Sequence, residues 1–173
     1  MLSVWLLLAA VTVGNADPGG LVVDDSVTDW QEAALNYEYA ADAQEEAAAE
    51  ALVESSYWRD AVHEDLAKAR RSRIQSAKKQ LRAADLLVAA SGSLDQAGRV
   101  WGQAASVAGR ETASGQYFQS SSVSAKSRAV SLLRQAVGLC EQAADVFSAE
   151  EDLLSQASAN HKAAGLRERL AKR

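Results

Sequence analysis

The chain has only two histidines, and their acidic neighbours decide whether they can hold a metal ion. A di-iron helical bundle takes a Glu-x-x-His pair from each of two facing helices. Here Asp60 lies three residues before His63, but the residue three before His161 is Ser158. Because one of the two acidic partners is missing, the sequence predicts no metal site.

Cys140 is the single cysteine, which excludes a disulfide framework and a multi-cysteine zinc site. It shares a helix face with His161, but the 21 residues between them amount to about 31 Å of helix, far beyond hydrogen-bond reach. Two interpretations of Cys140 therefore remain. It is either a small hydrophobic residue of the core or the site of an intermolecular disulfide in an exported chain.

Short catalytic and phosphate-binding motifs are also missing. The sequence contains no Gly-rich phosphate loop, no Gly-x-Ser-x-Gly elbow and no His-Glu-x-x-His helix. It therefore predicts no catalytic residues, no cofactor and no enzymatic activity. A helical-bundle enzyme that uses only carboxylates as acid and base is the weakest of the functional hypotheses.

Opposite charges are segregated along the chain. Residues 24–65 contain 13 acids and one base, Arg59, whereas residues 68–82 contain seven bases and no acid. The net charge of −5 is thus a sum over two opposed blocks. The acidic face of the first block consists of Asp42, Glu46, Glu50 and Glu54. The basic face of the second consists of Lys68, Arg71, Lys78, Lys79 and Arg82.

These two faces suggest partners. Each pair of like charges four residues apart disfavours an isolated helix by about 0.2–0.5 kcal/mol, so we expect the faces to meet within one chain or between two. The basic face also suits an anionic lipid surface. Nucleic acid is a poor candidate, because the chain is acidic overall and residues 59–100 contain no Phe, Trp or Tyr.

Helical periodicity dominates the sequence after the breaker at residues 17–20. Residues 21–91 contain neither Gly nor Pro and are rich in Ala, the strongest helix former. One predicted buried stripe consists of Ala47, Ala51, Trp58, Val62 and Leu66. Two further stripes run through residues 130–154, one of them with a gap at Glu151. The sequence predicts an all-α fold, an elongated antiparallel bundle of three or four long, Ala-rich amphipathic helices.

Three interruptions divide the helices in this interpretation. The first is a break at Ser55–Ser56, with a single helix over residues 29–90 as the alternative. Such a break would bring Asp42, Glu38, Glu32 and Asp29 near Arg70, Arg73, Lys79 and Arg82. The second interruption is the end of the helix at Ser91–Ser93, and the third is a loop or frayed helix over residues 109–122, after which Ser122 or Ser124 caps the last helix.

Gly98 and Gly102 lie four residues apart inside a predicted helix, and Ala105 and Gly109 continue the row of small residues. An interior Gly costs about 1 kcal/mol relative to Ala. We therefore expect both glycines to allow close packing of two helices. The alternative is a locally weak helix near a loop.

The first 13 residues carry no charged side chain. They are too short to span a bilayer, which takes about 20 residues, but they match the apolar region of a secretory signal. Gly14 and Ala16 supply small residues for cleavage after Ala16. An apolar helix within the core is the alternative. The predicted organisation is a leader over 1–16, a linker over 17–28 and a single helical-bundle domain over 29–173.

Two functional hypotheses follow. The first is a secreted or extracytoplasmic protein, membrane-associated if the leader is retained, that acts by binding protein partners, including itself as a homodimer. The second is a peripheral membrane protein that places its basic face, residues 68–82, on anionic lipid. Neither hypothesis involves a cofactor.

Overall fold

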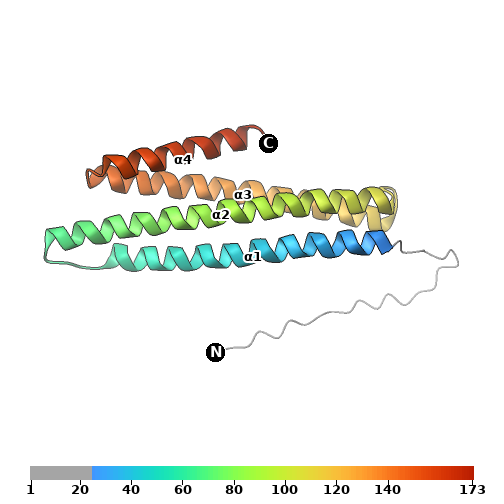
Figure 1. The fold of residues 1–173 in the computed structure, drawn as a ribbon, viewed down its shortest axis with the longest axis horizontal. Helices are drawn as coiled ribbons and strands as arrows, with labels where there is room; N and C mark the ends of the chain where they lie inside the picture. The colour runs from blue at the N-terminus through green and yellow to red at the C-terminus, as the bar shows by residue number, and fades with distance from the viewer. Residues whose placement is uncertain (1–24) are drawn as a thin grey trace, which may run out of the picture.

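A computed structural model describes residues 25–173, which form four α-helices and no strand (Figure 1). The helices are α1 (Asp25–Asp60), α2 (Leu66–Ala108), α3 (Ala113–Ala149) and α4 (Leu153–Ala171). Consecutive helices run antiparallel, and α4 folds back along part of α3. The predicted elongated bundle of antiparallel helices is thereby confirmed. The leader and its cleavage site lie outside the described residues.

Small side chains at intervals of seven residues hold α1 against α2. These are Ala34, Ala41, Ala48 and Ser55 on α1, and Ser76, Ala83, Ala90 and Ala97 on α2, each at most 4% exposed. Ser55 fixes the register, because its Oγ donates to the Ser76 carbonyl at 3.0 Å and lies 2.9 Å from Ser76 Oγ. Moving seven residues at a time from the Ser55–Ser76 contact, backwards along α1 and forwards along α2, places each small residue of one row opposite one of the other. A seven-residue repeat keeps the contact on one face of each helix, as in a coiled coil.

A second row, one residue further along α2, faces α3. It consists of Ala77, Ala84, Ser91, Gly98 and Ala105 on α2 and of Gly115, Ser122, Ala129, Ala136 and Ala143 on α3, all buried. Ser122 Oγ donates to the Gly98 carbonyl at 2.5 Å and sets this register. Ala77 and Ala143 share one apolar cluster, as the register requires. α2 is therefore the central helix, with one row of small residues for each neighbour.

Larger apolar side chains fill the space between the rows. Near the α2–α3 turn, the Trp101 ring stacks on Phe118 with ring centroids 5.5 Å apart. Trp101 Nε1 donates to Glu38 Oε1 at 2.8 Å, which satisfies the indole and joins α1 to α2. Buried indole N–H groups usually find such a partner.

The predicted break at Ser55–Ser56 is wrong, and so is the alternative of one helix over residues 29–90. α1 continues through both serines and ends at Asp60. Ser55 fits within the helix because it takes a small position in the α1–α2 row and its hydroxyl bonds to Ser76. The chain reverses over residues 61–65 instead, where the Asp65 carboxylate accepts from the Ala67 N–H at 2.8 Å and caps α2.

Of the other two expected interruptions, the helix end at residues 91–93 is wrong, and the loop over residues 109–122 is confirmed only at residues 109–112. α2 continues through residues 91–93, because Ser91 is buried in the α2–α3 row and Gly92 lies on the outside. α3 begins at Ala113, capped by Thr112, whose Oγ1 accepts from the Gly115 N–H at 3.0 Å. The long helix predicted at the C-terminal end is divided at residues 150–152, where its apolar stripe has a gap.

Replacing Ala90 with Leu tests the α1–α2 row. Ala90 is fully buried, and overpacking a tight contact costs about 1–3 kcal/mol. We expect the free energy of unfolding, measured by urea titration with circular dichroism, to fall by that amount. Ala89 is the matched control, because it is adjacent and exposed. Ala89→Leu should change stability by less than about 0.5 kcal/mol, and equal losses in both variants would contradict the row.

Candidate functional site

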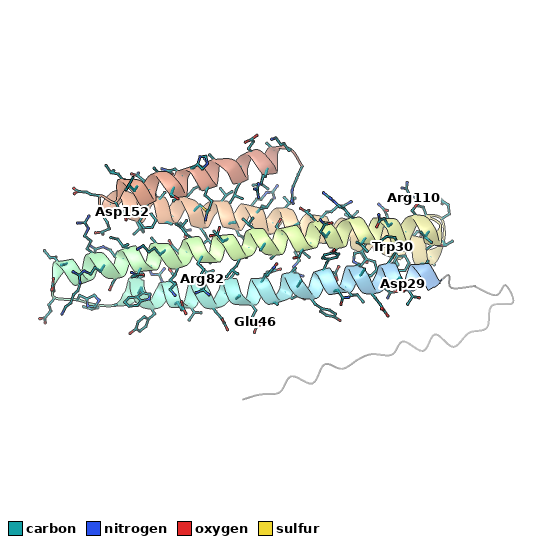
Figure 2. All side chains as sticks on the ribbon, viewed as in Figure 1. Asp29, Trp30, Glu46, Arg82, Arg110 and Asp152 are labelled. Atoms are coloured by element: carbon teal, nitrogen blue, oxygen red, sulfur yellow. The ribbon has the colours of Figure 1, made fainter. Side chains whose placement is uncertain are left out.

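The predicted acidic face lies along the outer side of α1. Asp42 pairs with Arg128 of α3 at 2.5 Å, and Glu54 pairs with Lys79 of α2. The hydrogen bond and the charge of Lys79 lower the pKa of Glu54. Glu46 and Glu50 are exposed, and no base of residues 27–173 forms an ion pair with either. Figure 2 shows Glu46 on the side of α1 away from α2.

Within residues 27–173, the two charged faces meet at one ion pair only, and the predicted pairing of Asp42 with Arg70 is wrong. Lys79 of the basic face contacts Glu54, whereas the neighbouring bases Arg70 and Arg73 bind Glu150 at the end of α3. The position of the turn is the reason. Because the chain reverses over residues 61–65, α2 is displaced along α1, and Asp42 lies far from Arg70.

Four members of the basic face stay exposed: Lys68, Arg71, Lys78 and Arg82. Within residues 27–173, none of the four forms an ion pair. Lys68 and Arg71 border a shallow depression together with Trp58 and His63. His63 Nε2 lies 2.7 Å from Ser72 Oγ, so this imidazole is engaged in a hydrogen bond between the turn and α2.

Gly98 is a point of close helix packing, as predicted. A β-carbon there would lie 3.2 Å from the Ser122 carbonyl oxygen and 2.8 Å from Lys126 Cγ, both on α3. At Gly102 the nearest atom would be Ser122 Oγ at 3.6 Å, an ordinary van der Waals distance. The close approach therefore requires glycine at Gly98 but not at Gly102.

Cys140 lies in the core with no exposed surface, and burial raises the pKa of its thiol. It shares an apolar cluster with Ala163 and Leu166 of α4. This position fits the interpretation of Cys140 as a core residue. The predicted intermolecular disulfide requires a surface thiol, which the folded chain does not present.

Sequence reasoning missed a group of exposed apolar side chains. Within residues 27–173, the large apolar residues that are 70% exposed or more are Val53, Tyr57, Val62, Leu66, Leu153 and Leu154. All six lie within about two helical turns of the chain reversals at residues 61–65 and 150–152. Figure 1 shows that both reversals are at the same end of the bundle.

Val62 and Leu66 belong to a stripe that the sequence predicts as buried, and this prediction is wrong. Because α1 ends at Asp60, the stripe does not continue past the turn, and Val62 is 94% exposed. We call Val53, Tyr57, Val62 and Leu66 the turn-end patch. Trp58 lies beside it, half-buried, with its ring edge-to-face against Tyr57 at 5.7 Å between centroids.

Residues 25–173 contain no helix that is long and apolar enough to cross a membrane, and no group of three or more His, Cys, Asp or Glu that could hold a metal ion. Glu46, Glu50 and Glu54 border an open depression. All three belong to one exposed helix face, which lacks the enclosed surroundings that separate the roles of an acid and a base.

Comparison of the chain with protein-family models, with curated proteins and with solved structures finds no match.

Replacing single glycines of α2 with Ala tests the close contact at Gly98. An Ala at Gly92 meets no atom within 4 Å, so the gain in helix propensity should raise the free energy of unfolding by about 0.5–1 kcal/mol. Gly98→Ala gains the same propensity but overpacks the α2–α3 contact, which costs about 1–3 kcal/mol. We expect urea unfolding to show Gly98→Ala as the less stable variant. A similar gain in both would contradict close packing.

Proposed function

We propose that the chain is an exported or membrane-associated helical-bundle protein that acts by binding other proteins, with a second copy of itself among the partners. The observation that carries this proposal is the turn-end patch. All four large apolar side chains are exposed; Val53, Tyr57 and Val62 border one open depression at the 61–65 turn, and Leu66 begins α2 directly after this turn. Contiguous exposed apolar surface on a folded protein is typical of an interaction site.

The composition of the patch supports a protein partner. Tyr57 and Trp58 belong to the residue types that dominate the binding energy of protein interfaces. Burying Val62 and Leu66, which are 94% and 83% exposed, would contribute about 1.5–3 kcal/mol each. Export is supported only by the apolar leader of the sequence.

The bundle supplies a rigid support for this patch. α1 and α2 are fixed in register by Ser55 and Ser76, which lie within six residues of the end of α1 and eleven of the start of α2. The patch is therefore carried on a defined hairpin end and not on a long loop. Binding by a preorganised surface loses less conformational entropy than binding by a flexible loop.

Removing the apolar surface of the patch tests this proposal. A partner protein is first captured from the native source. We expect its affinity for the double variant Val62→Ser/Leu66→Ser to be lower by about tenfold or more, since both apolar side chains would be missing from the interface. Capture is followed by cross-linking, mass spectrometry and a titration with the purified partner. Val123→Ser is the matched control, because Val123 is 59% exposed on α3 but lies outside the patch.

Circular dichroism should show that both variants are folded, since each side chain is exposed. Equal affinity of the partner for the patch variant and for the Val123 control would contradict the proposed role of the patch.

A peripheral membrane protein is the second candidate, favoured by the position of Lys68 and Arg71. Both are exposed, border the same depression as Trp58, and lie next to the patch. A base near an anionic surface contributes about 1 kcal/mol, so Lys68→Ala/Arg71→Ala should weaken pelleting with phosphatidylserine vesicles about 30-fold. Binding that is equal on phosphatidylcholine alone, or unchanged in this variant, would contradict this candidate.

A further inference from the structure

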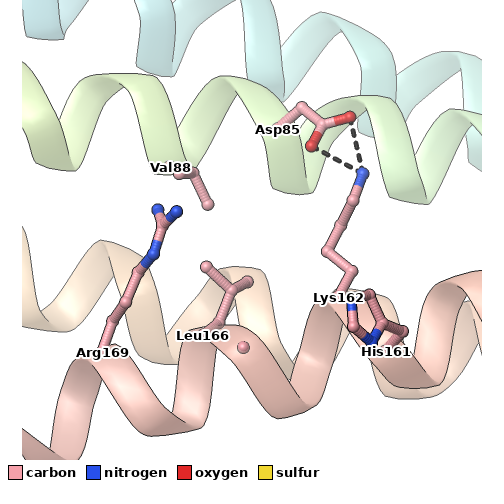
Figure 3. Close-up of a pocket in the computed structure, with 7 residues that line it drawn as sticks. Asp85, Val88, His161, Lys162, Leu166 and Arg169 are labelled. Atoms are coloured by element: carbon pink, nitrogen blue, oxygen red, sulfur yellow. Dashed lines mark hydrogen bonds and ion pairs between the residues drawn. The ribbon is translucent and has the colours of Figure 1, made fainter.

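α4 is attached to a rod that the other three helices already form. It has 19 residues, against 37 in α3, and only Ala159, Ala163 and Leu166 of α4 are buried. Its links to α2 include two ion pairs at the surface, beside shared apolar clusters. Lys162 Nζ lies 2.7 and 2.9 Å from the two Asp85 oxygens (Figure 3), and Arg173 pairs with Asp95.

The link between α3 and α4 is short and has an unfavourable backbone conformation. It comprises residues 150–152, and Glu151 has a φ of 58°. Glu151 is the only non-glycine residue with positive φ in the described chain, residues 25–173. A side chain with a β-carbon is disfavoured in this left-handed region, where glycine is the usual residue.

Two leucines directly after this link are left in solvent. Leu153 and Leu154 are 71% and 87% exposed, although they begin a helix that packs on the bundle. Leu154 is seven residues after Phe147, and Leu153 is seven after Val146. A helix that continued from α3 into α4 would therefore extend the apolar stripes of α3 through both leucines.

We propose that the surface of α2 and α3 beneath α4 is an interaction surface for α4 of a second copy. In the dimer, α3 and α4 straighten at Glu151 into one helix, and each α4 occupies the place that its counterpart has left. The contacts of α4 with α2 and α3 are recreated between the copies, including Lys162 with Asp85, whereas the cap that Asp152 gives α4 in the closed turn is lost. The proposal rests on the self-association part of the proposed function.

Two features of the structure favour this exchange over an unrelated dimer. Straightening the link removes the left-handed conformation of Glu151, and a short strained hinge promotes domain exchange. The two hinges also cross at the two-fold axis of such a dimer, which places Leu153 and Leu154 of one copy against those of the other. The exposed leucines thereby gain a partner that the single chain does not offer.

The first test asks whether the Lys162 and Asp85 that are in contact belong to the same chain or to two different chains. Equal amounts of ¹⁴N- and ¹⁵N-labelled chains are unfolded together and refolded at high concentration, and the dimer fraction is isolated. A carbodiimide then joins Lys162 to Asp85, whose side chains are in direct contact. Because equal amounts of the two chains pair at random, exchange predicts that about half of the linked peptides combine one ¹⁴N and one ¹⁵N chain. Linked peptides that all carry a single isotope would overturn the proposal, and so would a chain that stays monomeric in light scattering at all concentrations.

The second test uses the hinge. Glu151→Gly relieves the backbone penalty of the closed turn, so we expect the dimer dissociation constant to rise by about tenfold for each of the two hinges. Glu151→Ala, which keeps the β-carbon, should leave the constant near that of the natural chain. Leu153→Ser/Leu154→Ser should weaken the dimer without unfolding the monomer, because both leucines are exposed in the single chain.

A dissociation constant that is the same for Glu151→Gly and Glu151→Ala would contradict the role of the hinge. The hinge variants leave the turn-end patch itself unaltered, since Glu151, Leu153 and Leu154 lie outside residues 53–66. Failure of the exchange therefore leaves partner binding by the patch to its own test.

Discussion

The structure depends on the close approach of α2 to both of its neighbours. Residues at every seventh position of α2 are Ala, Ser or Gly in two adjacent rows, and the opposing rows of α1 and α3 are equally small. Such rows bury little apolar area for each residue, so the helices gain stability by packing over a long distance and not through a thick core. The length of the bundle and its thin cross-section follow from the same cause.

The sequence was sufficient for the helical class but not for the ends of the helices. Runs of Ala and the stripe through Leu133, Val137 and Cys140 predict buried helix, and these residues are buried. Ser55, Ser91 and Gly98 have the composition of breakers, yet each is a small residue at a helix contact. The helix propensity of a residue alone cannot tell a helix breaker from a small contact residue, because the presence of a closely packed partner helix decides which of the two it is. The seven-residue spacing was the signal available in the sequence.

The surfaces were harder to predict, because they depend on where the chain reverses. A turn at residues 61–65 instead of 55–56 changes which acid meets which base and leaves Val62 and Leu66 in solvent. Local charge complementarity gave the wrong register, since salt bridges at a surface contribute little, about 0–1 kcal/mol each. The rows of small residues set the register, and the charged side chains adapt to it.

The double row on α2 restricts how the length of this protein can vary. Adding one residue within α2 would rotate everything beyond it by about 100°, which removes both rows from their neighbours at once. A seven-residue addition would return both rows to their places, provided that α1 and α3 lengthen equally. Divergent copies of this bundle should therefore differ in length by whole heptads shared among three helices, or at the turns, where no row is interrupted.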